Sequence, residues 1–261
     1  MKKKINDALY IVPKLIKQMG LKPSLLYMLF NLKLKKLNQN KIFKTKSGIN
    51  IPLIDKKIIL YYNEYNEPDI VKYIKTTKDY NTFINIGAAY GEFLFFSAIN
   101  PKFDFIYGFE PVPNHFKIIN KVLKLNPNFA KKIKIHNIAL GNSTGPTKFF
   151  LNQETLTSSS LSPSSSGKEI EVNIRKLDDL KLQIKNTPLL LIDVEGYEIK
   201  VLKGAKDFIR KYRPTIILEV WDKEIPHYKK SISEINYKID YIWKKKHSNT
   251  KYWKISPINS N

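Results

Sequence analysis

Two glycines and one acidic residue stand at a spacing that suits nucleotide binding. In "TFINIGAAYGEF" (82–93) an apolar run ends at Gly87, and Gly91 precedes a helical pattern. Such glycines let a backbone approach a ligand closely, and free amides at a helix start favour an anionic group. Glu110 follows after about 20 residues, the spacing at which a carboxylate accepts hydrogen bonds from the ribose hydroxyls of an adenosine-containing cofactor. The pattern predicts a nucleotide site, although a ligand-free glycine turn and a helix N-terminal acid would give the same residues.

The glycine spacing also limits which nucleotide is expected. Three residues separate Gly87 from Gly91, whereas a dinucleotide fold would show G-x-G-x-x-G around a pyrophosphate. The chain also lacks G-x-x-x-x-G-K-[ST], the loop that binds the phosphates of ATP or GTP. Neither a dinucleotide nor a phosphate-loop nucleotide is therefore expected.

A second acidic group follows a later apolar strand. In "LLLIDVEGYEIKVLKGA" (189–205) the strand ends at Asp193 and Glu195, and Gly196 opens a helix. One carboxylate could serve as a general base, or both could bind a hard cation such as Mg²⁺. In the alternative interpretation Glu195 and Glu198 stabilise the helix N-terminus electrostatically and Asp193 is only a cap.

These residues need elements that bring them together. From Phe83 onward strand and helix patterns alternate, which predicts an α/β fold with a doubly wound, mostly parallel sheet. The expected strands are 82–87, 103–110, 132–140, 188–194 and 215–220, and the main expected helices are 92–99, 113–126 and 198–212. Ligands of such sheets bind at the carboxyl ends of the strands, so chemistry is expected at 85–91, Glu110, Ala139 and Asp193.

The flanking segments have patterns of their own. Alternation around Ser47-Gly48 predicts a hairpin over 41–54, and 67–77 has a helical pattern. Residues 237–256 alternate as a hairpin at the sheet edge would. The serine-rich stretch 152–169 has no periodic apolar content, so a mobile loop is expected there, either a disordered bulge or a segment that closes over a substrate.

Composition sets the wider limits. The 261 residues are 43% hydrophobic, enough for a real core, and the absence of cysteine excludes disulfides, thiolate metal sites and cysteine nucleophiles. No apolar run reaches the roughly 18 residues of a membrane-spanning helix, and a cytoplasmic location is expected. The expected domains are a basic amphipathic helical extension at 1–40 and a catalytic domain at 41–261.

Basic residues dominate the start of the chain. Twelve lysines and one acidic residue lie between Lys2 and Lys46, within a formal net charge of +22. A basic face of this kind could attract an anionic membrane surface, nucleic acid or an acidic glycan. A genome composition that favours lysine would produce the same excess without any partner.

The segments together resemble the FkbM-type methyltransferases, which use S-adenosylmethionine (SAM). The matching segments, in the family's order, are "INIGAAYG", "GFEPVPNHF", "HNIALGNSTG", "RKLDDL", "IDVEGYEIKVLKGA" and "IILEV". The resemblance covers roughly residues 63–220, and the acidic and glycine residues from Asp193 to Glu198 are its most diagnostic part. It implies a Rossmann-like class I methyltransferase fold.

The resemblance also implies roles for individual residues. Gly87 and Gly91 would face the methionine end of SAM, and Glu110 would hold the ribose. The segment 137–140, which includes Ala139, would lie near the adenine.

Three positions depart from the family pattern. Where the family usually has aspartate, asparagine and lysine, this chain has Asn85, Ala89 and Leu191. Asn85 and Ala89 remain candidate cofactor residues, but Asn85 lacks the negative charge that would favour the cationic methionine amine. Weaker cofactor binding, or a binding protein that kept the fold and lost catalysis, is the alternative that these positions raise.

The implied reaction is methyl transfer from the sulfonium of SAM to a hydroxyl of a sugar, glycan or small metabolite. The protein would align the reactants and supply a base for the hydroxyl proton. Asp193 and Glu195 are the first candidates for this base, and His227 is a third, although a lone histidine is often a surface residue. No residue is assigned as a metal ligand, while Mg²⁺ at the two carboxylates stays an open alternative.

A nucleic-acid methyltransferase is a further alternative because the same fold performs that chemistry. Amino-base methyltransferases usually carry an asparagine-proline-proline-aromatic turn after the fourth strand, and here 193–198 read "DVEGYE". Nucleic acid is therefore not the expected partner. The expected partner is a hydroxylated acceptor, with peripheral contact to an anionic membrane as an additional hypothesis; the sequence indicates no oligomeric state.

Overall fold

The computed structural model describes residues 41–54, 56–62, 64, 67–151, 161, 168–244 and 248–258, and four isolated positions between 21 and 28. Most of the expected helical extension at 1–40 and of the serine-rich loop at 152–169 lies outside the described residues, so both stay predictions. None of the described helices is long and apolar enough to span a membrane.

The described residues form a central sheet of seven strands in the order β11-β12-β10-β9-β3-β4-β5. The strands are β3 (Thr82–Ile86), β4 (Phe105–Phe109), β5 (Ile133–His136), β9 (Leu189–Ile192), β10 (Thr215–Trp221), β11 (Tyr237–Lys244) and β12 (Thr250–Pro257). The five strands from β10 to β5 are parallel to their neighbours, while β12 is antiparallel to both β10 and β11. The expected α/β fold and the edge hairpin at 237–256 are both confirmed.

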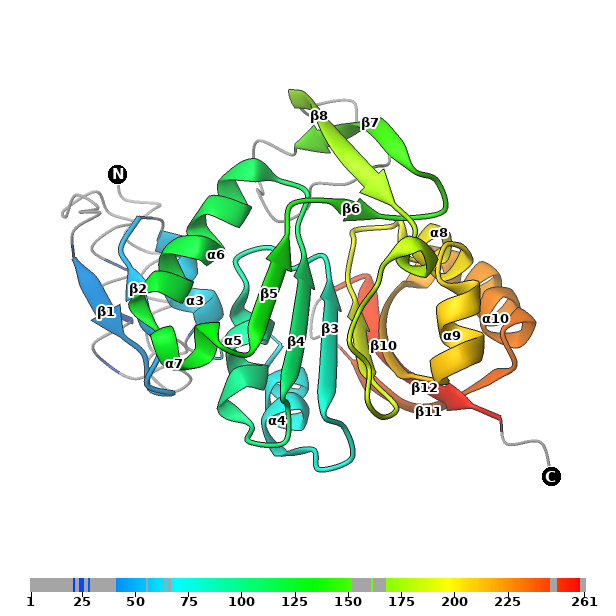
Figure 1. Ribbon diagram of the computed structural model, residues 1–261, viewed down its shortest axis with the longest axis horizontal. Coiled ribbons are helices and arrows are strands. Elements are labelled where there is room, and N and C mark those ends of the chain that lie inside the picture. Colours follow the sequence, from blue (N-terminus) through cyan, green and yellow to red (C-terminus); the bar gives the residue numbers. More distant parts are fainter. Residues whose placement is uncertain are drawn as a thin grey trace.

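Helices cover both faces of this sheet. One face carries α3 (Lys56–Tyr62), α4 (Pro68–Thr76), α5 (Glu92–Ile99), α6 (Pro113–Leu125) and the short α7 (Pro127–Ala130), and the other carries α8 (Glu198–Lys203), α9 (Lys206–Tyr212) and α10 (Ile225–Glu234) (Figure 1). Along β3, Phe83 packs with the first group, whereas Ile84 and Ile86 pack with the second. Because successive side chains of a strand point to opposite faces, a run that is apolar throughout becomes buried on both sides.

A small second sheet lies above the carboxyl ends of β3, β4 and β5 (Figure 1). Its strands, in the order β6-β8-β7, are β6 (Ala139–Leu140), β8 (Lys168–Arg175) and β7 (Gly145–Leu151). The expectation of one strand over 132–140 is wrong, because β5 ends at His136 and β6 pairs with β8 instead of β4. The sequence analysis did not predict the strands β7 and β8.

The expected single helix over 198–212 is also divided. Helix α8 ends at Lys203 and α9 begins at Lys206. A Cβ atom at Gly204 would lie 1.8 Å from the carbonyl oxygen of Gly141, so the glycine lets this turn touch the chain that follows β6. Short 3-10 helices, η1 (Leu177–Asp179) and η2 (Asp222–Glu224), precede β9 and α10.

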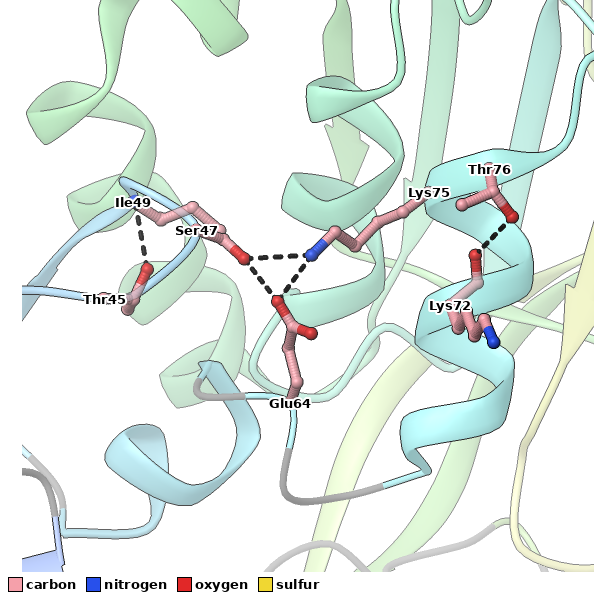
Figure 2. A network of polar contacts seen from close by, with 7 residues as sticks. All are labelled: Thr45, Ser47, Ile49, Glu64, Lys72, Lys75 and Thr76. Carbon is pink, nitrogen blue, oxygen red and sulfur yellow. Dashed lines mark hydrogen bonds and ion pairs between the residues drawn. The ribbon is translucent and has the colours of Figure 1, made fainter. Parts of the chain in front are cut away.

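The predicted hairpin at 41–54 is confirmed as β1 (Ile42–Lys44) paired with β2 (Asn50–Pro52). A polar network ties its turn to the helical layer (Figure 2). The Ser47 hydroxyl donates to the Glu64 carboxylate, and Lys75 Nζ lies 2.6 Å from Glu64 Oε1 and 3.2 Å from Ser47 Oγ. The network therefore joins the hairpin to α4 and to the segment that follows α3.

This network changes the ionisation of Glu64. Burial raises the pKa of its carboxyl, but hydrogen bonds from Lys75 and Ser47, and the charges of Lys75 and Lys46, outweigh that effect and leave the pKa below the ordinary value of 4.5. A carboxyl group whose pKa is lower in the folded state than in the unfolded state stabilises the fold at pH values above the unfolded-state pKa. That stabilisation is lost as pH falls through the folded pKa.

We expect Lys75→Met to lower the free energy of unfolding by about 1 kcal/mol at pH 7, because the network is only partly exposed. The loss should be smaller at about pH 4, because the stability contributed by a carboxyl with a lowered pKa declines once the pH falls below the unfolded value of 4.5. Urea unfolding at both pH values tests this, with Lys72→Met on the exposed side of α4 as the control. An equal loss at both pH values would show that Lys75 acts by packing alone.

Candidate active site

The candidate site is a cavity where the carboxyl ends of β3, β4 and β9 meet. The lining residues come from the turns after these strands, from the start of α6 and from β7. They are Gly87, Ala89, Glu110, Pro111, Val112, His115, Phe149, Asp193, Val194 and Glu195. Five of the residues singled out in the sequence therefore lie around one cavity: Gly87, Ala89, Glu110, Asp193 and Glu195.

The turn after β3 depends on glycine at its first position. Gly87 has φ of +87°, and a Cβ atom there would lie 1.9 Å from the Asp193 carbonyl oxygen. No side chain fits at such a distance, so glycine alone lets the turns after β3 and β9 touch. The Gly87 and Ala88 amides donate to Phe109 O, and Ala89, at φ of +46°, donates to Glu110. These three amides of the turn are thus paired within the protein.

Glu110 follows β4 and is buried, with 4% of its surface exposed. Its Oε2 accepts from the Ala89 amide at 2.7 Å, and its Oε1 accepts from the Val112 amide at 2.8 Å. His115 Nδ1 lies 3.4 Å from Oε1. A carboxylate offers about four acceptor positions, so Glu110 can hold the turn and still accept bonds from a ligand.

A second, apolar cavity adjoins the first and shares Gly87 and Phe149 with it. Ala139 of β6 and Tyr197 also line it. The small sheet thus forms one wall. The chain reaches this wall after β5 because Asn137 Nδ2 donates to the carbonyl oxygens of Glu110 and Pro111, at 2.8 and 3.0 Å, and so fixes the turn between the two sheets.

The turn after β9 is stabilised by the buried carboxylate of Glu198. Glu198 Oε1 accepts from the amides of Val194 and Gly196, at 3.1 and 3.0 Å, and its Oε2 accepts from the Tyr228 hydroxyl at 2.6 Å. Burial raises the pKa of Glu198 despite these bonds. Glu195 has φ of +57°, a conformation that non-glycine residues rarely adopt and that concentrates at functional sites.

Asp193 stands at the centre of this turn. Its Oδ2 accepts from the Tyr252 hydroxyl at 2.5 Å, which ties the site to β12. The first residue before α8 is Tyr197, and no side chain caps that helix, so the alternative of Asp193 as a helix cap is wrong.

Comparison with known proteins decides the family. A model of the methyltransferase FkbM domain matches residues 85–242, more than half of the chain. The chain belongs to the FkbM methyltransferase family. The resemblance read from the sequence motifs is therefore confirmed.

One solved structure agrees with this family assignment at the level of fold. The FkbM methyltransferase of Methylobacillus flagellatus KT is 16% identical with a TM-score of 0.51, and the alignment covers 97% of this chain and 60% of that one. The chain thus spans three fifths of that protein's length. TYW2 of M. jannaschii, in complex with AdoMet, is 14% identical with a TM-score of 0.49 over 86% of this chain and 89% of that one. A search of curated proteins found no match.

Two of the departures from the family pattern are neighbours in the sheet. Asn85 of β3 stands opposite Leu191 of β9, and both are fully buried. Partners in parallel strands present their side chains to the same face. The aspartate and lysine usual at these positions would therefore adjoin each other, and their joint replacement removes two opposite charges and leaves the net charge unchanged.

Three sequence-predicted residues of the chain do not line either cavity. Asn85 is fully buried in β3. A Cβ atom at Gly91 would lie 2.9 Å from Ile119, so glycine there allows a close approach to α6. His227 is on α10, 70% exposed, with Nδ1 3.0 Å from Glu224 Oε2. Its role as a base stays a prediction.

The described part of the chain contains no group of three or more histidine, aspartate or glutamate residues placed to hold a metal ion. Asp193 and Glu195 both line the cavity, but they are only two carboxylates. The Mg²⁺ alternative has no support from this arrangement.

Sequence analysis missed His115 and Phe149 as residues of the cavity. His115 had a weak signal, because "EPVPNHF" places it in the first helical turn after Glu110. Phe149 had none, since its position depends on the pairing of β7 with β8.

Proposed function

We propose that this protein is a SAM-dependent methyltransferase that transfers the methyl group to a hydroxyl oxygen of a sugar, glycan or small metabolite. Family membership supports methyl transfer. The observation that carries the proposal is the buried Glu110 carboxylate, which shares one cavity with Gly87 and Asp193. Such a carboxylate at the second strand end suits the two hydroxyls of a ribose.

The residues present fit SAM along the length of the two cavities. Glu110 has acceptor positions left for the ribose hydroxyls. The apolar cavity at Ala139, Phe149 and Tyr197 suits the adenine ring, because aromatic and aliphatic walls bury a flat heterocycle favourably. The turns at Gly87 and Asp193 would then lie beside the methionine portion.

When bound, SAM supplies a methyl group activated by its cationic sulfur. The protein's own residues align the acceptor and remove its proton. Asp193 and Glu195 line the cavity on the side of β9, so either carboxylate can accept the proton that leaves the acceptor hydroxyl. The bond from the Tyr252 hydroxyl holds the Asp193 carboxylate in place.

Replacement of the base should slow turnover and leave cofactor binding largely intact. We will compare Asp193→Asn with Glu195→Gln. The variant that removes the base should lower kcat by about 10²- to 10⁴-fold. His227→Gln tests the third candidate, and its exposed side chain predicts a small effect. Turnover that is lost in His227→Gln alone would assign the base to α10 and contradict both carboxylates.

Calorimetric titration with SAM and S-adenosylhomocysteine is the first test of the proposal. Binding by the wild-type protein supports it, and hydroxylated sugars are then screened for methyl transfer. A folded wild-type protein that binds neither ligand overturns the proposal.

A protein that keeps the fold without catalysis is the second candidate, and the replacements at Asn85, Ala89 and Leu191 favour it. Because Asn85 and Leu191 are paired, their replacement is also compatible with a working site. The same titration separates the two functions. Peripheral contact with an anionic membrane would involve residues 1–40, and vesicle binding by the full chain and by a variant without residues 1–38 would test it.

A further inference from the structure

A buried carboxylate at the start of α5 makes none of the hydrogen bonds that shape the candidate site. Glu92 is the first residue of α5, and only 3% of its surface is exposed. Its Oε2 has no hydrogen-bond partner within the part of the chain that the structure describes, and no described cation pairs with it. A buried charge without a partner is costly, so a retained buried carboxylate calls for a cation or a proton.

Three other carboxyl groups lie near enough to Glu92 to affect its charge. Burial, together with the negative charges of Asp193, Glu110 and Glu67, raises the pKa of Glu92 to about 8. Asp193 and Glu110 both line the cavity. Glu92 begins the helix that follows the turn between Gly87 and Gly91. The nearby Tyr62 hydroxyl cannot relieve it, because that hydroxyl donates to the Tyr90 carbonyl oxygen at 2.7 Å.

Asn85 adds a second unsatisfied group on the same side of the sheet. It is fully buried, and neither its Oδ1 nor its Nδ2 has a hydrogen-bond partner among the described residues. It pairs with Gly108, where a Cβ atom would meet Leu94 of α5 at 2.7 Å, so Asn85 lies under the same helix that Glu92 begins. Buried polar groups are rarely left unpaired unless a ligand or ion satisfies them.

We propose that Glu92 is the anionic group that binds the ammonium of the methionine portion of SAM, with the Asn85 amide oxygen as a second acceptor. The proposal rests on the proposed function. It explains how the site keeps a negative charge although Asn85 carries none. Glu92, at the start of α5, supplies that charge. The carboxylate is then ionised and paired when the cofactor is bound.

The test compares SAM with a ligand that lacks both the amino-acid group and the sulfonium charge. SAM carries the whole methionine portion, whereas 5′-methylthioadenosine keeps the adenosine and the sulfur but lacks the amino-acid group. We expect Glu92→Gln to weaken SAM binding by about 10- to 100-fold, the usual effect of losing a hydrogen bond to a charged group, and to leave methylthioadenosine binding unchanged. S-adenosylhomocysteine, which has the amino-acid group and a neutral sulfur, separates the two differences, and Glu92→Gln should weaken its binding as much as that of SAM. Glu171→Gln, an exposed acid on β8, is the matched control.

Two further measurements separate ligand binding from a structural role. Adding Asn85→Asp to Glu92→Gln returns a carboxylate to the same region and should restore most of the SAM affinity. In the wild-type protein, titration of SAM in buffers of different ionisation enthalpy should show net proton release at pH 7, because Glu92 must ionise to pair with the ammonium. The groups that also face Glu92 are Asp193, Glu110, Glu67 and Tyr62.

Each outcome bears on one proposal. If wild-type protein binds SAM and Glu92→Gln weakens SAM and methylthioadenosine equally, or weakens neither, the role of Glu92 is overturned and the proposed function stands. SAM binding without proton release also counts against Glu92. If the folded wild-type protein does not bind SAM, the proposed function itself fails.

Discussion

The Glu110→Ala variant should bind SAM at least about 100-fold more weakly than the wild-type protein. A hydrogen bond to a charged group contributes about 1.5–3 kcal/mol, and a ribose offers two hydroxyls to this carboxylate. A loss of about 2.7 kcal/mol already corresponds to 100-fold in the dissociation constant. Calorimetric titration measures the change directly.

Stability must be followed in the same variant, because Glu110 also holds the turn. Its removal leaves the buried amides of Ala89 and Val112 without their acceptors, and each such group costs about 1–3 kcal/mol. Urea unfolding shows whether the variant is folded at the temperature of the titration. Glu171→Ala is the control for loss of a carboxylate in general. Wild-type affinity in folded Glu110→Ala would remove the ribose contact from the proposed site.

Gly87→Ala should have the second large effect, on stability as well as on binding. The added Cβ atom would lie 1.9 Å from the carbonyl oxygen of Asp193, a backbone atom that cannot rotate away, at a φ of +87°. We expect the free energy of unfolding to fall by about 3 kcal/mol or more, since both overpacking and backbone strain contribute. SAM binding should be lost because the turns after β3 and β9 must separate.

Gly48→Ala is a matched control for the strain alone. Gly48 has φ of +81°, and a Cβ atom there would meet nothing within 4 Å. This variant should lose about 1 kcal/mol of stability and bind SAM normally. If Gly87→Ala and Gly48→Ala cost the same, the contact between the two turns is not what requires glycine at Gly87.

The sequence predicted the sheet and the position of the site because both depend on local signals. Apolar runs between helical patterns mark strands buried on two faces, and polar residues at their carboxyl ends mark the cavity. Glu110 and Asp193 carried such signals, since each directly follows an apolar run. The structure places both around one cavity.

The second sheet and the break between α8 and α9 depend on contacts between distant segments, which a single sequence does not show. The chain leaves the main sheet after β5 because Asn137 donates hydrogen bonds to the carbonyl oxygens of Glu110 and Pro111. The turn could not be predicted, because the strand pattern in the sequence continues to Leu140. The break at Gly204 requires the backbone of Gly141 as its neighbour. Glu92 was missed because an acid in the first turn of a helix ordinarily needs no further explanation.

The bond between Tyr252 and Asp193 has a consequence for the order in which the protein acquires its site during synthesis. The two residues are separated by 59 positions, and β12 can join the sheet only beside β10. A nascent chain that has exposed every strand through β10 already holds Gly87, Glu110 and Asp193, yet it still lacks the hydroxyl that fixes the Asp193 carboxylate. Because domains fold as they emerge from the ribosome, we expect the walls of the cavity to assemble before the tail hairpin docks and the Asp193 carboxylate to be fixed last.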